Sequence, residues 1–293
     1  MKIAITGANG YIGQELIYIL KERGHKIFAL NRQQLYGQPE TLAASLENTD
    51  AVINLAGAPI LQRWTKFNQS VIYNSRVVTT RNLTQAINLL APGNRPRIFV
   101  SASAVGIYQT GQSHDDSSSK FDPGFLGKLV TDWEKASDEL PVDVRKVTFR
   151  IGVVLGRESH TIKKMLPLFK LGLGGKLGNG QQPFPFIHIH DLVLAFYQSL
   201  EDETFTGIYN LVAPDQTTNQ RFTQLLAKKL KGPAFFKVPC FMLKLIYGRA
   251  SEIILKGQRV IPNRLLSKGF MFQYPDISAC IEEILQLNGS KSS

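Results

Sequence analysis

The chain has 293 residues, of which 43% are hydrophobic and 19% charged, and its formal net charge is +11 at pH 7. That composition is ordinary for a protein with a buried core, and the length suits one large α/β domain and a smaller one. No apolar run approaches the roughly 20 residues of a membrane helix, and the first residues read as a strand rather than a signal peptide. Two cysteines, Cys240 and Cys280, are too few for a disulfide framework and form no Cys-x-x-Cys metal motif. We therefore expect a cytoplasmic protein without a metal site or a membrane partner.

The positive charge is concentrated toward the C-terminus. Residues 228–268 contain ten Lys or Arg and a single acid, Glu252. Such a stretch can attract nucleic acid, an acidic membrane surface or an anionic substrate, although a solvated basic face is the commoner outcome. No RNA- or DNA-binding motif accompanies the charge, so we do not expect a nucleic-acid partner.

Short apolar runs alternate with amphipathic stretches through the first two thirds of the chain. The apolar runs span residues 2–6, 26–30, 51–55, 97–101, 144–150 and 207–212. The helical patterns between them span residues 12–23, 71–90, 126–139 and 192–200. Strands that are buried on both faces and separated by helices predict a doubly wound parallel sheet, the α/β fold of the Rossmann type.

The pattern changes after about residue 214, where only helices are predicted, at residues 221–230, 239–256 and 276–287. We therefore expect a Rossmann domain over residues 1–213 and a small, mostly helical domain over residues 214–293. Residues 156–185 are expected to contribute to a substrate cleft between the two.

A glycine-rich turn follows the first strand. Gly7 permits a tight turn, Gly10 lets the backbone approach a pyrophosphate, and Gly13 lets the next helix pack closely on the strand. The helix N-terminus then offers free N–H groups and a partial positive charge to the phosphates. We predict a dinucleotide site here, and the turn residues expected to contact the cofactor are Gly7, Asn9, Gly10, Tyr11, Ile12 and Gly13.

The end of the second strand favours NADP(H) over NAD(H). NAD enzymes usually carry an acid there, which accepts hydrogen bonds from the ribose 2′-hydroxyl. This chain has Asn31 and Arg32 instead, and no Asp or Glu lies between Lys26 and Pro39. A guanidinium can pair with a 2′-phosphate through two parallel hydrogen bonds, although an ordinary surface arginine at a strand end would look the same.

Motifs along nearly the whole chain resemble the extended short-chain dehydrogenase/epimerase superfamily. Beyond the glycine turn they comprise Asn54-Leu55-Ala56-Gly57, Ser75-Arg76, Val100–Gly106, Trp133-Glu134 and Phe186–Leu192, and near the C-terminus Gly257–Pro262, Gly269-Phe270 and Tyr274-Pro275. The C-terminal motifs are similar to those of atypical "epimerase family" proteins with a C-terminal extension. Members are commonly described as NAD(P)-dependent nucleotide-sugar epimerases without a known substrate, and some carry a cell-division label.

The resemblance implies further cofactor contacts. The backbone of Leu55, Ala56 and Gly57 would line the adenosine side, and Arg76 would be a second basic contact to NADP(H). Ser101 lies in the motif beside this site, and Val153 lies where such proteins hold the nicotinamide end.

The usual acid/base pair of this superfamily is missing. Extended reductases use Ser or Thr together with Tyr-x-x-x-Lys on one helix face, and the Lys lowers the pKa of the tyrosine that exchanges a proton with the substrate. Ser103 matches the serine. Leu126 and Val130 occupy the tyrosine and lysine positions, and a register shifted by one residue gives Phe125 and Leu129 instead.

Other groups could take over the proton transfer, and we name Ser103 and Tyr108 as the candidate catalytic residues. Each alternative has an ordinary structural interpretation: Tyr108 as a packed aromatic, and Lys128 as a solvated helix residue. His188 and His190 would alternate on a strand and point to opposite faces, and Asp191 would cap the helix after it.

Two functions remain open. The first is an NADP(H)-dependent oxidoreductase or epimerase acting on a small, sugar-like or anionic substrate in a pocket outside the strand C-termini. The second is a non-catalytic NADP(H)-binding regulatory or scaffold protein, including one with a role in cell division. The missing acid/base pair favours the second, whereas the glycine turn and Ser103 fit both. A homodimer is compatible with either.

Overall fold

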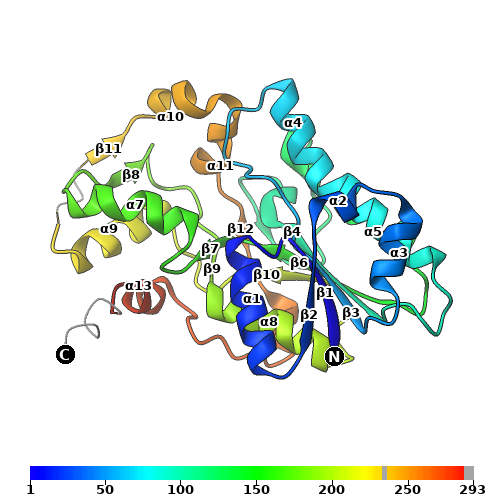
Figure 1. Cartoon of the computed structure of the whole chain (residues 1–293). Coiled ribbons are helices and arrows are strands. Elements are labelled where there is room, and N and C mark those ends of the chain that lie inside the picture. The colour runs from blue at the N-terminus through cyan, green and yellow to red at the C-terminus, as the bar shows by residue number, and fades with distance from the viewer. Residues whose placement is uncertain (233–235, 287–293) are drawn as a thin grey trace.

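The six apolar runs form one parallel sheet. The computed structural model describes residues 1–232 and 236–286, and the strand order is β10–β6–β4–β3–β1–β2. The strands are β1 (Lys2–Thr6), β2 (Lys26–Leu30), β3 (Ala51–Asn54), β4 (Ile98–Ala104), β6 (Arg145–Ile151) and β10 (Gly207–Leu211). The chain moves from β1 to β2 on one side and then crosses to β3 on the other, so the winding direction reverses between β1 and β3 (Figure 1). The predicted doubly wound Rossmann fold is confirmed.

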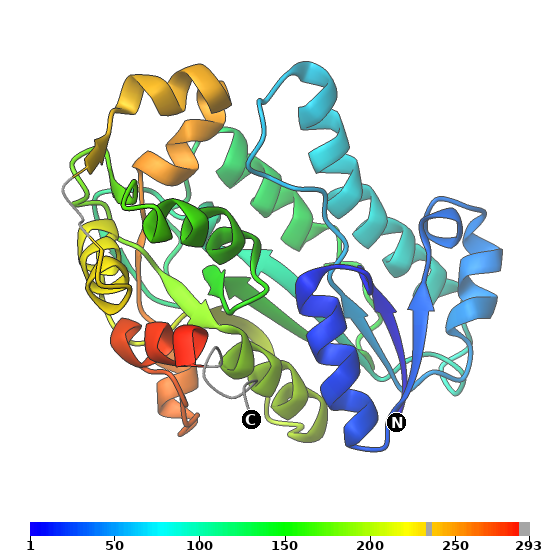
Figure 2. The same ribbon diagram turned by 60° about the vertical axis from the view of Figure 1, so that its left-hand side comes forward.

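Helices cover both faces of this sheet. On one face α1 (Tyr11–Glu22) and α8 (Ile189–Glu201) lie side by side, and on the other lie α3 (Pro39–Leu46) and α5 (Thr79–Leu89) (Figures 1 and 2). Successive residues of β1 point to opposite faces, so Ile3 and Ile5 pack with α1 and α8 while Ala4 packs with α3 and α5. Burial of each strand on both faces explains the continuous apolar runs.

Helix α6 (Phe125–Lys135) lies beside α5 on the same face of the sheet, and most of the other elements lie around the ends of the sheet. The other helices are α2 (Arg32–Leu35), α4 (Lys66–Tyr73), α7 (His160–Lys170), α9 (Asn219–Lys229), α10 (Cys240–Tyr247), α11 (Glu252–Leu255), α12 (Asn263–Ser267) and α13 (Ile277–Gln286). A π-helix (Asn74–Val78) joins α4 to α5, and 3₁₀ turns span Val105–Ile107 and Gly248–Ser251. Three short parallel pairs are β5 (Ser113–His114) with β12 (Arg259–Val260), β7 (Val153–Leu155) with β9 (Phe186–His188), and β8 (Gly175–Leu177) with β11 (Phe236–Val238).

A second core lies beside the Rossmann domain. It joins Phe169 of α7 and Phe186 of β9 to Phe222 of α9 and Ile281 of α13. Between α11 and α13 the chain returns to the large domain, where residues 260–270 pack against it through β12 and α12. The two cores therefore interleave along the sequence, and the domain boundary between residues 213 and 214 stays a prediction.

Two expectations for the start of α8 are wrong. His188 and His190 do not alternate along a strand, because β9 ends at His188 and the helix begins directly after it, so the two rings lie 5.1 Å apart. Asp191 is not the N-cap, a position held by His188. Asp191 is fully buried, and its carboxylate accepts the N–H groups of Gln273 at 2.7 Å and Tyr274 at 3.0 Å. It therefore ties the C-terminal segment to α8.

The residues that the structure describes contain neither a membrane-spanning helix nor a metal-binding group of side chains. None of their helices is long and apolar enough to cross a membrane. None of their His, Cys, Asp and Glu side chains form a group of three or more that could hold a metal ion.

His188 connects the start of α8 to α13. Its ring is fully buried; Nδ1 accepts the N–H of His190, so Nε2 carries the proton that is donated to Glu283 at 2.9 Å. Burial lowers the pKa of His188 to about 4, although the Glu283 carboxylate acts in the opposite direction. At neutral pH the histidine is therefore uncharged.

This lowered pKa predicts a loss of stability in mild acid. The unfolded chain binds the proton with the ordinary pKa of 6.5 and the folded chain only near 4, so stability falls as the pH drops through that interval. Between about pH 7 and pH 5 we expect the unfolding free energy to fall by roughly 2 kcal/mol more in the wild type than in His188→Gln. Urea denaturation at both pH values measures this. His160→Gln, at an exposed position of α7, should retain the wild-type pH dependence, and equal dependence in wild type and His188→Gln would contradict the assignment.

Candidate functional site

The glycine turn lies where the winding direction of the sheet reverses. Gly7 has a φ of +68°, and a Cβ there would lie 2.7 Å from the Leu55 carbonyl oxygen, so only glycine fits between the ends of β1 and β3. A Cβ on Gly13 would lie 2.4 Å from the Gly7 carbonyl oxygen, which keeps α1 close to the strand. The helix begins after Gly10 with no side-chain cap, so its first N–H groups remain for another acceptor. Asn9 and Gly10 are exposed at the tip of the turn.

The loop after β3 is fixed against this turn by two hydroxyl groups. Thr6 Oγ1 accepts the N–H groups of Leu55 at 2.9 Å and Ala56 at 3.0 Å. Ser75 Oγ accepts the N–H of Ala58 at 2.9 Å. The predicted contacts at residues 55–57 therefore lie next to the glycine turn, with their backbone already ordered.

Arg76 lies on the π-helix behind this loop. Its guanidinium carbon is 3.0 Å from the position that a Cβ on Gly57 would occupy and 5.4 Å from the centre of the Trp133 ring. Among the described residues it forms one hydrogen bond, to the Ile72 carbonyl oxygen at 3.3 Å, and no ion pair. Burial lowers its pKa to about 10 because no carboxylate compensates for the lost hydration. The sequence predicted an α-helix here but not the wider π-helical turn at Asn74–Val78. Such π-helical turns are often found at functional sites.

Asn31 and Arg32 follow the other neighbour of β1. Asn31 forms a capping box with Gln34: its Oδ1 accepts the Gln34 N–H at 2.9 Å, and its own N–H donates to Gln34 Oε1 at 2.9 Å. This cap places Arg32 at the first position of α2, where its side chain is exposed. Asn31 therefore shapes the turn, and Arg32 is accessible to a ligand.

The remaining predicted cofactor residues differ in accessibility. Tyr11 and Ile12 are half-buried in the first turn of α1, and Val153 is half-buried at the start of β7. Burial raises the pKa of Tyr11, whose hydroxyl lies 2.1 Å from where a Cβ on Gly156 would be. Ser101 is only 4% exposed, and its Oγ accepts a hydrogen bond from Asn54 within the sheet. Its side chain is thus bound within the sheet, where it also donates to the Ala102 carbonyl oxygen at 3.0 Å.

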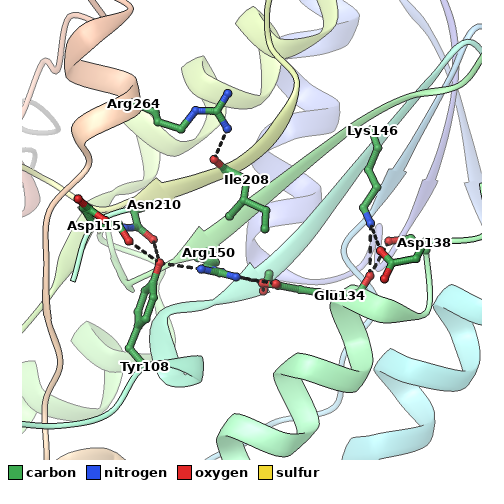
Figure 3. A network of polar contacts seen from close by, with 11 residues as sticks. Tyr108, Asp115, Glu134, Asp138, Lys146, Arg150, Ile208, Asn210 and Arg264 are labelled. Carbon is green, nitrogen blue, oxygen red and sulfur yellow. Dashed lines mark hydrogen bonds and ion pairs between the residues drawn. The ribbon is translucent and has the colours of Figure 1, made fainter. Parts of the chain in front are cut away.

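The candidate catalytic residues belong to one buried polar network, and Figure 3 shows its members Tyr108, Arg150 and Glu134. Ser103 Oγ donates to Glu134 Oε1 at 2.6 Å. Arg150 holds the same carboxylate through two hydrogen bonds of 2.8 Å, and its third nitrogen donates to Tyr108 Oη at 2.8 Å. Although burial alone lowers the pKa of Arg150, the hydrogen bonds and ion pair with Glu134 raise it above its ordinary value. The network thus contains a tightly held ion pair.

Tyr108 occupies the inner end of this network. It is fully buried, stacks on His114 at 4.6 Å, and lies 2.8 Å from Asn210 Oδ1 and 3.0 Å from the Asp115 carbonyl oxygen, both acceptors for its single proton. Burial raises the pKa of its hydroxyl, while Arg150 acts in the lowering direction. Like Ser103, which is 3% exposed, Tyr108 is bound within the network, and its catalytic role stays a prediction.

The helix face that normally carries the acid/base pair is apolar. Leu126 is half-buried beside Gly106, and Val130 is 2% exposed in the same small core as Tyr108. Lys128 points to solvent. Glu134, one turn beyond Val130, is the ionisable group that lies within hydrogen-bond distance of Ser103.

Sequence reasoning missed the roles of Glu134 and Arg150, although both left a signal. Arg150 stands between Phe149 and Ile151 in a run predicted as a fully buried strand, and a buried arginine needs a carboxylate partner. Glu134 lies at helical spacing from the two vacant acid/base positions, which places it on the face that meets β4.

Comparison with known proteins agrees with this geometry. Residues 3–211 match the model of the NAD dependent epimerase/dehydratase family, and residues 238–284 match a domain of unknown function, DUF1731. The human epimerase family protein SDR39U1 is 38% identical over 97% of this chain and 100% of its own length.

Two solved structures are also similar. The crystal structure of human SDR39U1 (isoform 2) with NADPH has a TM-score of 0.91 and 37% identity over 98% of this chain and 99% of that one. The nucleoside-diphosphate sugar epimerase from Corynebacterium glutamicum has a TM-score of 0.77 and 28% identity over 97% of this chain and 58% of that one. The motifs, the fold and these matches agree, and the chain belongs to the NAD dependent epimerase/dehydratase family as an atypical extended short-chain dehydrogenase.

Proposed function

We propose that the chain binds NADP(H) and exchanges hydride with a small anionic or sugar-like substrate. The observation that carries the cofactor assignment is Arg76, a half-buried cation without a carboxylate partner among the described residues, beside Gly57. A 2′-phosphate would supply the missing negative charge, and no acid between Lys26 and Pro39 would repel it. The NADPH in the similar human structure supports the same cofactor.

The residues present fit such a dinucleotide. The space left by Gly10 and the uncapped N–H groups of α1 would receive the pyrophosphate, while Arg32 and Arg76 would pair with the 2′-phosphate. Val153 would lie at the nicotinamide end. When bound, the cofactor supplies or accepts the hydride.

The substrate proton is assigned to Ser103 and Glu134. Ser103 Oγ already donates its own proton to Glu134, and its lone pairs remain able to accept the proton of a substrate hydroxyl. In the oxidative direction the hydroxyl proton would pass to Ser103 Oγ while the Ser103 proton passes to Glu134. Arg150 fixes the carboxylate so that one oxygen always faces the serine.

Two observations support the proposed substrate class: the positive charge near the C-terminus and the description of a similar protein. The basic stretch at residues 228–268 lies in the part of the chain predicted to cover the substrate, and cations there would favour a phosphate- or carboxylate-bearing molecule. The Corynebacterium relative is a nucleoside-diphosphate sugar epimerase, which is consistent with such a substrate.

A second function is favoured by one observation. The acid/base positions hold Leu126 and Val130, and the protons of Ser103 and Tyr108 are already donated within the protein. A regulatory NADP(H)-binding protein would need the cofactor turn but no proton route. Absence of turnover with carbonyl and nucleotide-sugar panels, with NADPH affinity intact, would favour this function.

Substitution of Gly10 tests the phosphate turn. Gly10 has a φ of −78°, which any residue can adopt, and a Cβ there would meet only the Gly7 carbonyl oxygen, at 3.3 Å. We therefore expect Gly10→Val to fold but to fill the pyrophosphate space, so that NADPH no longer raises the melting temperature. Gly93→Val, at an exposed glycine with no atom within 4 Å of its Cβ position, is the matched control. If NADPH still protects Gly10→Val as it protects the wild type, the turn has been misassigned.

Cofactor preference tests the two arginines. We expect the wild type to bind NADPH more tightly than NADH. Loss of one charge-assisted pair in Arg32→Ala or Arg76→Gln should weaken NADPH binding by about 10- to 100-fold, corresponding to roughly 1.5–3 kcal/mol. Isothermal titration calorimetry measures both cofactors, and Lys21→Ala, an exposed change on α1, should alter neither. Equal wild-type affinities for NADPH and NADH would sink the NADP(H) assignment.

Substitutions of Ser103 and Tyr108 should have different effects on turnover. Ser103→Ala should lower kcat/KM by about 10²–10⁴-fold without changing NADPH affinity, because the proton route is lost. Tyr108→Phe should lower stability by about 1–3 kcal/mol, because buried partners lose a hydrogen bond, but leave turnover per folded molecule unchanged. NADPH absorbance with nucleotide-sugar and carbonyl substrates gives the rates. Full activity in Ser103→Ala would rule out the proposed proton route.

A further inference from the structure

Helix α10 is apolar but almost entirely exposed. In Cys240–Tyr247 only Leu243 is buried, while Phe241 and Leu245 are each 69% exposed and Ile246 is 55% exposed. A helix rich in large apolar side chains is normally buried, and exposed apolar groups of this kind usually mark an interaction site.

The exposed side chains share one side of the helix. At 3.6 residues per turn, Phe241, Met242, Leu245 and Ile246 lie together, and Leu243 lies on the opposite side. The helix is held at its last turn, where Arg63 donates to the carbonyl oxygens of Leu245 and Ile246. Within the part of the chain that the structure describes, these contacts leave the apolar side without a cover, at the outer edge of the molecule beside β11 (Figure 1).

Cations lie on α10 and on the segments that precede and follow it in the chain. Lys237, Lys244 and Arg249 are exposed and form no ion pair with any residue that the structure describes. The single acid in residues 228–268, Glu252, is already paired with Lys256 at 2.9 Å. The surface thus combines apolar side chains with uncompensated positive charge.

We propose that α10, with Lys237 and Arg249 beside it, docks the protein on an anionic membrane surface. Helices that lie in the membrane interface bury an apolar face at the headgroup boundary and present Lys or Arg to acidic lipids. The absence of a spanning helix among the described residues does not oppose this, because a surface-bound helix needs no span. This proposal departs from the expectation of no membrane partner. That expectation rested on the lack of a spanning helix, which docking on a membrane surface does not need.

The same charges disfavour a second copy of the chain as the cover. An isologous contact through α10 would bring the basic segments around α10 of both copies close together, and Glu252, the single acid in residues 228–268, is already paired with Lys256. An acidic lipid surface satisfies both the apolar side chains and the cations.

Vesicle flotation with the full-length protein tests the proposal. We expect binding to phosphatidylcholine–phosphatidylglycerol vesicles, little binding to phosphatidylcholine alone, and a decrease with added salt. Phe241→Ser/Leu245→Ser should weaken binding by about tenfold or more through lost apolar burial, and Lys237→Glu/Lys244→Glu by at least about tenfold through lost attraction. Met271→Ser and Lys135→Glu, at other exposed positions, are the matched controls and should bind like the wild type.

NADPH affinity is measured in parallel, so this proposal and the cofactor assignment can fail separately. Wild-type protein that ignores the anionic vesicles would overturn the docking surface. Equal binding of the wild type and both double variants would do the same. A lipid-independent dimer that Phe241→Ser/Leu245→Ser dissociates would assign the apolar side to a second copy instead.

Discussion

The contact between the ends of β1 and β3 organises the ligand side of this protein. Gly7 brings its backbone against the Leu55 carbonyl, and Thr6 hydrogen-bonds the next two N–H groups of that loop. Because the winding direction reverses at this point, the loops diverge beyond the contact and leave room for a ligand. The π-helix then closes the arrangement from behind through Ser75 and Arg76. The cofactor assignment depends on this constraint more than on any single glycine.

The sheet and its glycine turn could be predicted because their determinants are local. Continuous apolar runs at residues 51–55 and 97–101 indicate strands buried on both faces, and the turn chemistry at residues 7–13 is specific. The start of α8 could not be predicted in the same way. Asp191 looks like an N-cap, but its actual partners, Gln273 and Tyr274, are 82 and 83 residues away and become neighbours only through tertiary packing.

The candidate site shows the same division between local and long-range determinants. Arg32 and the vacancies at Leu126 and Val130 could be read by position, whereas the burial of Tyr108 depends on Asn210, in a strand 102 residues later. The short distance in sequence between Tyr108 and Ser103 therefore did not reveal that the Tyr108 side chain is buried. A buried polar group reports its role through its partners, and those partners come from distant segments.

The Glu134–Arg150 pair explains how the usual lysine can be absent without disturbing the fold. Removing one partner of a buried ion pair costs roughly 3–5 kcal/mol, so both residues are required once either is present. They join α6 to β6 and fix Ser103 at the same time. Val130 can then pack with Tyr108 as an apolar residue, because the helix is already held against the sheet one turn later. The residue that holds α6 against the sheet, Glu134, is thus different from the residues at the usual acid/base positions, Leu126 and Val130. In the proposed proton route through Ser103, Glu134 would also take part in proton transfer.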